Sequence, residues 1–301
     1  MSTVSHFRDI DDLTSDEVRE VLTTAQTLRS EAPASTPLAH RTLAMLFEKP
    51  STRTRVSFEA GMTELGGHAI FLGPDVTQLG RGEPLKDTAR ALSGYVDGIM
   101  ARVFEHAHIE ELAQYASVPV INGLTDDAHP CQTLADLLTI QEYFGGLEGR
   151  SAAWVGDGNN VARSFTLGCA MMDVDLSIAT PPGLGVGEEI LDRAADLGHA
   201  PTVAPDPAAA VADADVIYTD VWVSMGEEDE REAKLAAFDG YQINEDLLAS
   251  APSDAVVMHC LPAHRGEEIT DAVLESDRSI VWRQAENRMH AQNGLLCYLL
   301  E

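Results

Sequence analysis

Short apolar runs alternate with amphipathic stretches along most of this sequence. The apolar runs predict strands at eight places: Thr42–Phe47, His68–Leu72, Gly98–Arg102, Pro119–Asn122, Ala152–Val155, Asp175–Ala179, Val216–Thr219 and Val256–His259. Helical patterns lie between them at Arg53–Leu65, Leu85–Tyr95, Leu134–Phe144 and Ala162–Met172. Strands that alternate with helices are typical of mainly parallel sheets with helical crossovers. The sequence therefore predicts an α/β fold in which sheets are flanked by helices.

A glycine-rich stretch, Gly145-Gly146-Leu147-Glu148-Gly149, is the candidate boundary between two domains. Four of the expected strands precede it and four follow it. A chain of 301 residues is long enough to form two cores of ordinary size. We expect α/β domains at about 1–143 and 147–275. The last helical pattern, about 284–301, has apolar residues suited to packing, and we expect it to return to the first domain.

The charge balance excludes some classes of partner. The chain has 20 basic and 49 acidic side chains, a formal net charge of −29, and its only lysines are Lys49, Lys86 and Lys234. Such a surface repels nucleic acid and anionic membranes. Self-repulsion destabilises a compact chain at low salt, and at about 1 M salt a Debye length of roughly 3 Å screens it. We expect adaptation to a salt-rich cytoplasm; an ordinary acidic protein is the alternative.

The cysteines are Cys131, Cys169, Cys260 and Cys297, which are far apart and form no CxxC pair. This spacing favours reduced thiols over a disulfide framework or a structural zinc site. No apolar run of about 18 residues is present, and the first residues lack the apolar core of a signal peptide. We therefore expect a cytoplasmic protein that requires no metal ion and no cofactor.

Hydroxyl and guanidinium groups are clustered where the first expected strand gives way to a helix, in Ser51-Thr52-Arg53-Thr54-Arg55. Backbone N–H groups are free at a helix start and the helix dipole is positive there, so an anion is stabilised. Serine and threonine add neutral donors, and arginine adds charge-assisted ones. An ordinary N-cap is the simpler alternative. A cap alone does not require two arginines, Arg53 and Arg55, in a chain with so few basic residues, and this favours an anion site that both arginines serve.

Four segments, in the same order along the chain, resemble motifs of the aspartate and ornithine carbamoyltransferases. Ser51–Arg55 resembles their phosphate-binding motif, and Asp126–Gln132 resembles their second motif. Asp220–Gly226 resembles the ornithine loop, and His259–Pro262, with sequence HCLP, resembles the motif that marks the ornithine branch. The resemblance implies carbamoyl phosphate and L-ornithine as substrates, L-citrulline and phosphate as products, and a place in arginine metabolism, in the urea cycle or the arginine deiminase pathway.

The resemblance implies a set of ligands for carbamoyl phosphate: Ser51, Thr52, Arg53, Thr54, Gln78, Arg102, His129, Gln132, Cys260, Leu261 and Arg288. Gln78 lies in a glycine-bearing loop like the family's mobile loop. Arg102 ends an expected strand, where active-site groups of open α/β sheets are usual, although a surface ion pair is the alternative. His129 would polarise the carbamoyl oxygen, and Gln132 would bind the carbamoyl NH2 group.

The same resemblance implies a site for ornithine. Asn160 would bind the α-carboxylate, Asp220 would bind the α-ammonium, and Ser224 and Met225 would close over the amino acid. The Cys260 sulfur would lie near the attacking amine and orient it without a covalent intermediate. The catalytic residues would be Arg102, His129, Cys260 and Asp220. The family resemblance also implies a homo-oligomer, a trimer or a multiple of trimers.

Three other functions compete with this interpretation. The first is a dinucleotide-dependent oxidoreductase: the segment Gly156-Asp157-Gly158 after an expected strand begins like a dinucleotide fingerprint, but Val161 occupies the third glycine position. Another amine, such as putrescine, aspartate or an acetylated ornithine, could replace ornithine. A module that binds an anion without turnover is the remaining alternative.

Overall fold

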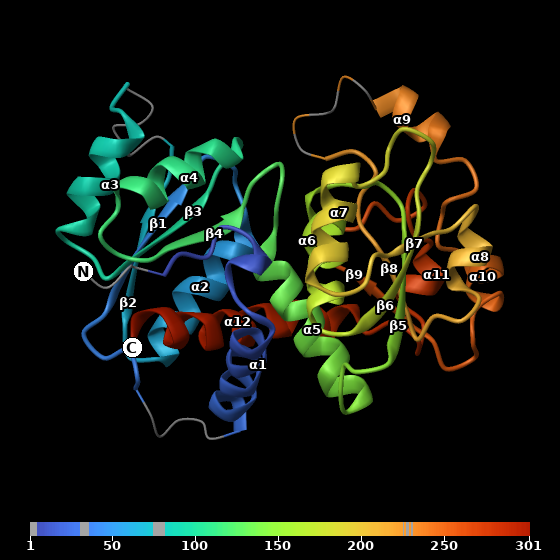
Figure 1. The fold of residues 1–301 in the computed structure, drawn as a ribbon, viewed down its shortest axis with the longest axis horizontal. Helices are drawn as coiled ribbons and strands as arrows, with labels where there is room; N and C mark the ends of the chain where they lie inside the picture. The colour runs from blue at the N-terminus through green and yellow to red at the C-terminus, as the bar shows by residue number, and fades with distance from the viewer. Residues whose placement is uncertain (1–4, 31–35, 75–81, 225, 227–228, 230) are drawn as a thin grey trace. The chain divides into compact units, whose positions relative to one another are not determined.

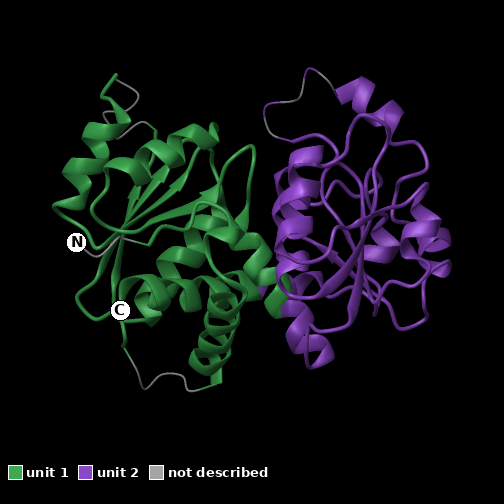
Figure 2. Cartoon of the chain, viewed as in Figure 1, with its two compact units in different colours: residues 1–138, 287–301 green, residues 139–286 purple. Residues whose placement is uncertain are grey.

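Figure 1 shows the computed structural model of the chain, which describes residues 5–30, 36–74, 82–224, 226, 229 and 231–301. The chain divides into two compact units, residues 1–138 with 287–301, and residues 139–286 (Figure 2). Each unit contains one parallel sheet, and helices flank it. The predicted α/β fold with mainly parallel sheets is confirmed.

The first unit contains a four-stranded sheet in the order β2-β1-β3-β4. Its strands are β1 (Thr42–Phe47), β2 (His68–Leu72), β3 (Gly98–Arg102) and β4 (Val120–Leu124). Its helices are η1 (Ile10–Asp12), α1 (Ser15–Ser30), α2 (Thr52–Glu64), α3 (Leu85–Ser93), α4 (His106–Tyr115), most of α5 (Pro130–Phe144) and most of α12 (Val281–Leu300). Leu46, Ile99 and Leu112 belong to the core cluster that joins β1 and β3 to α4. Because the strand order reverses between β1 and β3, their carboxyl ends flank a topological switch point, the usual ligand site of such sheets.

The second unit contains a five-stranded sheet in the order β7-β6-β5-β8-β9. Its strands are β5 (Arg150–Val155), β6 (Val174–Ala179), β7 (Thr202–Val203), β8 (Val216–Thr219) and β9 (Val256–His259). Its helices include α6 (Asn160–Met171), α7 (Glu188–Leu197), α8 (Pro207–Val211), α9 (Arg231–Ala237), α10 (Glu245–Ala249) and α11 (Asp271–Leu274). Buried Tyr218 packs edge-on against Trp154 and Phe165, with ring centroids 4.9 and 5.0 Å away. Here the strand order reverses between β5 and β8, which defines the switch point of this sheet.

All eight strands expected from the sequence are present, and five of them have the same bounds as the apolar runs: β1, β2, β3, β8 and β9. The structure adds β7, a pair of exposed residues that pairs with β6. The chain passes from the first unit to the second between residues 138 and 139, inside α5. It returns to the first unit between residues 286 and 287, inside α12. The domain bounds expected from the glycine-rich stretch stay a prediction.

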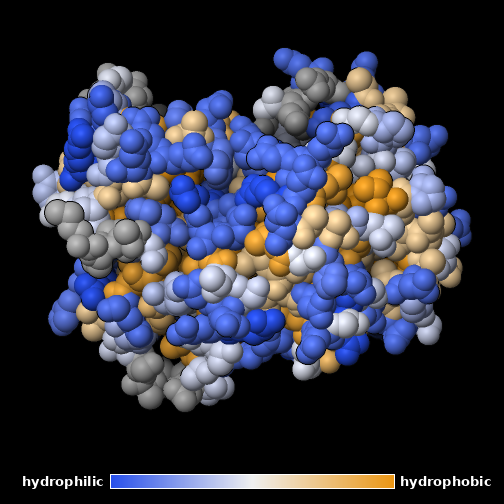
Figure 3. Space-filling view, in the orientation of Figure 1, coloured by the Kyte–Doolittle hydropathy of each residue, from blue (hydrophilic) through white to orange (hydrophobic). Residues whose placement is uncertain are grey.

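The surface of each unit is rich in hydrophilic side chains on the face shown in Figure 3. In the described part of the chain, no helix combines the length and the apolar character that crossing a membrane requires.

Candidate active site

The segment expected to bind phosphate, Ser51–Arg55, forms the start of α2 in the first unit. Ser51 is the N-cap: its Oγ accepts a hydrogen bond from the Thr54 backbone N–H at 3.3 Å and donates to Thr54 Oγ1 at 3.0 Å. Arg53 is exposed beside it and forms no hydrogen bond or ion pair with the described residues. In the sheet, Phe47 at the end of β1 pairs with Arg102 at the end of β3. The segment therefore comes soon after β1, and Arg102 ends β3. These are the two strands that flank the switch point.

Arg55, the second arginine of the segment, is engaged elsewhere. Its Nε donates to Glu59 Oε1 at 3.0 Å, and its guanidinium lies 3.9 Å from the centroid of the Phe71 ring. A guanidinium above an aromatic ring is stabilised by the ring quadrupole. The sequence interpretation that both arginines serve the anion is therefore revised: Arg53 is the available one, and Arg55 stabilises the packing of α2 on β2.

A chain of buried hydrogen bonds joins three helices of the first unit. Arg288 of α12 donates to Thr54 Oγ1 at 3.2 Å and to Gln132 Oε1 at 2.5 Å. Gln132 Nε2 donates to Asp136 Oδ1 at 2.7 Å. These four side chains are at most 5% exposed. The network fixes the direction of the Gln132 amide, because its oxygen faces Arg288 and its NH2 group faces Asp136.

His129 lies immediately before α5 and is 4% exposed. Burial, and then the positive charges of Arg288 and Arg102, hold the pKa of His129 well below the usual 6.5. The ring is therefore neutral at pH 7. A neutral imidazole influenced by two positive charges can donate an N–H to a substrate oxygen, as expected for a group that polarises a carbonyl.

An ion pair between a buried lysine and an exposed aspartate, which the sequence analysis missed, connects the two loops that carry these groups. Lys49 is 3% exposed; its Nζ pairs with the Asp126 carboxylate and lies 4.4 Å from the centroid of the Phe104 ring. Lys49 follows β1 and precedes the segment Ser51–Arg55, whereas Asp126 follows β4 and precedes His129. The ion pair thus connects the residues just before Ser51 with the loop that carries His129.

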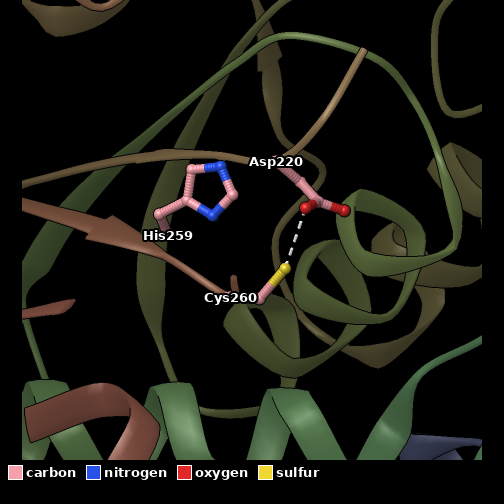
Figure 4. A group of neighbouring side chains, drawn as sticks. All are labelled: Asp220, His259 and Cys260. Carbon is pink, nitrogen blue, oxygen red and sulfur yellow. Dashed lines mark hydrogen bonds between the residues drawn. The ribbon is translucent and has the colours of Figure 1, made fainter. Parts of the chain in front are cut away.

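Asp220 and Cys260 are adjacent in the second unit, at the carboxyl ends of β8 and β9. The strands pair Thr219 with His259, so the next residue of each strand lies side by side. The Cys260 thiol donates to Asp220 Oδ1 at 2.9 Å (Figure 4). Asp220 is 7% exposed and Cys260 is half-buried. The structure therefore brings together the carboxylate and the thiol that were expected to act on ornithine.

Asn159, which the sequence analysis did not single out, completes this group. Its Nδ2 donates to Asp220 Oδ2 at 2.9 Å, and its Oδ1 caps α6 by accepting from the backbone N–H groups of Val161 and Ala162 at 3.0 and 3.1 Å. The signal was present, because asparagine directly before a helical pattern is a typical N-cap. Asn160, the predicted carboxylate ligand, is the first residue of α6 and is half-buried.

Two predicted site residues, Gln78 and Met225, lie outside the described residues. Ser224 is half-buried just before Met225. Leu261 follows Cys260 and has a positive φ of 61°, which is uncommon for a residue with a side chain. Thr52 is exposed at the first position of α2.

The segment that resembles a dinucleotide fingerprint has a different explanation. A Cβ atom on Gly158 would lie 2.2 Å from the carbonyl carbon of Gly185, so only glycine fits against this backbone. Asp157, between the two glycines, forms a buried ion pair with Lys234 Nζ at 3.3 Å. The glycines of this turn are thus accounted for by packing, without a pyrophosphate.

Two domain models of one family together match nearly the whole chain. The aspartate/ornithine carbamoyltransferase carbamoyl-P binding domain matches residues 5–142, and the Asp/Orn binding domain of the same family matches residues 148–299. The chain belongs to the aspartate/ornithine carbamoyltransferase family.

Relatives within the aspartate/ornithine carbamoyltransferase family match from end to end. Ornithine carbamoyltransferase of Haloquadratum walsbyi is 62% identical over 300 residues, 100% of this chain and 99% of the relative. The Archaeoglobus fulgidus enzyme of the same name is 54% identical and covers 99% of this chain and 98% of its own. The structure of ornithine carbamoyltransferase from Pyrococcus furiosus is 48% identical with a TM-score of 0.94, and it covers 100% of this chain and 98% of its own.

The thiols of this carbamoyltransferase family member differ in accessibility. Burial raises the pKa of Cys131 to about 12, and burial together with Glu301 raises the pKa of Cys297 to about 12. Cys131 Sγ donates to the Asn122 carbonyl at 3.3 Å, which confirms that it belongs to the core although it lies between His129 and Gln132.

Donor atoms of Asp220, His259 and Cys260 lie within 4.8 Å of one another, a spacing that could hold a metal ion. Hydrogen bonds already occupy these donors, however. Both ring nitrogens of His259 are bonded, one to Glu268 and one to the Leu261 N–H, and the thiol is bonded to Asp220. A metal ion would have to break these bonds, so we assign the group to hydrogen bonding.

Proposed function

We propose that this protein transfers the carbamoyl group of carbamoyl phosphate to the side-chain amine of L-ornithine and releases L-citrulline and phosphate. The observation that supports ornithine most directly is the pairing of Cys260 with Asp220 in a unit that matches an Asp/Orn binding domain. The names of the full-length relatives support the same substrate.

In this proposal the first unit binds carbamoyl phosphate. Exposed Arg53 and the free N–H groups at the start of α2 bind the phosphate, with Ser51, Thr52, Thr54, Gln78, Arg102 and Arg288 as further ligands. The neutral His129 donates to the carbamoyl oxygen, on which negative charge develops during attack. Gln132 accepts a hydrogen bond from the carbamoyl NH2 through its Oε1, the amide atom that faces Arg288.

The second unit positions ornithine. Asp220 binds the α-ammonium, Asn160 binds the α-carboxylate, and Ser224 and Met225 contact the amino acid. The Cys260 thiol, held by Asp220, and Leu261 orient the reacting end. The amine lone pair attacks the carbamoyl carbon, the bond from that carbon to the phosphate oxygen breaks, phosphate leaves with the electron pair, and the amine nitrogen loses its proton. Arg102, His129, Asp220 and Cys260 are the catalytic residues.

An assay for citrulline formation tests the proposal. Purified protein with carbamoyl phosphate and ornithine is expected to form citrulline and phosphate in equal amounts. A panel with putrescine, aspartate and acetylated ornithine separates ornithine from other amines, because putrescine lacks the α-carboxylate that Asn160 would bind. Binding of carbamoyl phosphate without product from any amine would instead identify an anion-binding module.

The rate of citrulline formation is expected to rise from pH 6 to pH 9. The ornithine amine is lysine-like, with a pKa near 10.4, so its neutral fraction rises about tenfold for each pH unit. His129 adds no opposing change, because its lowered pKa keeps the ring neutral over this range. The measurement is kcat/KM for ornithine against pH at constant ionic strength. A flat profile would show that loss of the amine proton does not limit the reaction.

The proposal includes a salt-rich cytoplasm and a trimeric assembly, the latter supported only by family resemblance. With a formal net charge of −29, the folded chain repels itself at low ionic strength, and molar salt screens this repulsion. We expect the melting temperature to rise by at least several degrees between about 0.05 M and 2 M KCl. Thermal unfolding followed by circular dichroism measures it, and an unchanged melting temperature would contradict salt adaptation.

A further inference from the structure

A buried histidine, which directly precedes Cys260 in the sequence, forms a pair with a buried glutamate. His259 and Glu268 are both 0% exposed, and His259 Nε2 lies 2.9 Å from Glu268 Oε1. A carboxylate removed from water is costly unless hydrogen bonds compensate it. Neither residue is among the groups that contact substrate in the proposed reaction, so the pair requires another explanation.

The hydrogen bonds around the ring determine which nitrogen carries the proton. The Leu261 backbone N–H donates to His259 Nδ1 at 2.9 Å, so Nδ1 must present a lone pair. The proton of a neutral ring is then on Nε2, which donates it to Glu268 Oε1. The same Glu268 oxygen accepts the His264 backbone N–H at 2.6 Å, which fixes the carboxylate in turn. An acceptor at Nε2 and a donor at Nδ1 together select one tautomer.

The bond to Leu261 holds a strained turn. Leu261 has a φ of 61°, a conformation that costs free energy for a residue with a Cβ atom and persists only where its surroundings enforce it. Cys260 lies between Leu261 and His259, and its thiol reaches Asp220 (Figure 4). The Gln284 side chain fixes the His259 backbone separately, by accepting its N–H at 2.8 Å. The His259 imidazole therefore connects the end of β9, which Gln284 fixes, to the turn at Leu261 that follows Cys260.

We propose that Glu268 is a positioning residue: it holds His259 in the Nε2-H tautomer, so that Nδ1 holds the Leu261 N–H and thereby fixes Cys260 for the incoming amine. This inference rests on the proposed function for its effect on catalysis, but its effect on the ring is independent of any substrate.

The first test uses the unchanged protein labelled with 15N-histidine. Long-range 1H–15N spectra of imidazole rings distinguish the two neutral tautomers and the charged ring, and His259→Gln identifies the signal by its loss. The expected result is Nε2-H for His259. An Nδ1-H tautomer or a charged ring would overturn the proposal, because neither can accept the Leu261 N–H.

The second test compares variants at position 268. Glu268→Leu removes the acceptor at similar volume, and we expect a mixture of tautomers and a kcat for citrulline about 100-fold lower, since a misplacement of about 1 Å has this effect. Carbamoyl phosphate affinity should stay within about twofold. Glu268→Gln keeps Oε1 as an acceptor and should retain kcat within about tenfold, with some loss because its NH2 replaces Oε2, which has no hydrogen-bond partner among the described residues.

Glu275→Leu is the matched control, because it removes an exposed carboxylate of the same unit that binds Arg265. It should change neither the tautomer nor kcat.

An unchanged kcat in the Glu268→Leu protein would overturn the proposal. A kcat about 100-fold lower in the Glu268→Gln protein would overturn it as well. If Glu268→Leu does not fold, the unchanged protein's tautomer and Glu268→Gln still decide. Failure of the proposed function is distinguishable, since the unchanged protein would then form no citrulline whatever its His259 tautomer.

Discussion

Replacing Arg53 by alanine is expected to weaken carbamoyl phosphate binding by about 100- to 1,000-fold, the scale of losing one partner of a hydrogen-bonded charge pair. Arg53 is exposed at the first turn of α2 and forms no bond with the described residues, so its charge is available to a ligand. In a chain with a net charge of −29, a dianionic substrate needs a local positive field. Isothermal titration with carbamoyl phosphate measures the change directly.

Arg55→Ala is the control for this prediction. It removes the same charge two residues further along the same helix, where the guanidinium is bound to Glu59 and lies over Phe71. We expect an affinity for carbamoyl phosphate within a few-fold of the unchanged protein, together with a small loss of stability. Equal losses of affinity in both variants would mean that only the total charge matters, and the assignment of Arg53 as a phosphate ligand would be wrong.

Replacing Asp220 by asparagine is expected to lower kcat/KM for ornithine by about 1,000-fold, because the α-ammonium of ornithine would lose the carboxylate proposed to bind it. Asp220 also accepts two hydrogen bonds, from the Cys260 thiol and from the Asn159 amide. An asparagine side chain presents one acceptor and one donor, so one of these bonds must break and the thiol changes position. Steady-state kinetics with ornithine varied at saturating carbamoyl phosphate measure the loss.

Asp215→Asn is the matched control, at the opposite end of the same strand. Asp215 precedes β8 and accepts a hydrogen bond from the Ser151 backbone N–H at 3.0 Å, which an asparagine oxygen can still accept. Because ligand sites of parallel sheets lie at the carboxyl ends of strands, kcat/KM should stay within a few-fold. An Asp220→Asn protein that keeps more than a tenth of its kcat/KM would contradict the role of Asp220.

The strands could be predicted because parallel strands are buried on both faces and therefore form continuous apolar runs. Met45 and Met258 lie in such runs, and both are 0% exposed. β7 could not be predicted in this way, because Thr202 and Val203 are exposed at the edge of the sheet. The helix start at Ser51 was predictable from local chemistry, and the observed N-cap has the expected geometry.

The contacts of the candidate site were harder to predict, because they join residues far apart in the chain. Arg288 reaches Gln132 across 156 positions, and Lys234 reaches Asp157 across 77. No local pattern marks such pairs, and only the family resemblance suggested Arg288. Glu268 is nine residues from His259, but neither helical nor strand periodicity relates the two. A motif cannot reveal a residue such as Glu268, because the motif contains His259 but not the side chain that holds His259 in place.

The burial of lysine has a practical consequence for chemical labelling. Lys49 and Lys234 are enclosed in ion pairs with Asp126 and Asp157, so neither ammonium is open to an acylating reagent. Lys86, exposed in α3, is the one remaining lysine. An amine-reactive dye should therefore attach at a single side chain, apart from the α-amino group, whose lower pKa near 8 allows separate control. The folded protein thus offers one defined attachment point, on α3, without any cysteine being introduced.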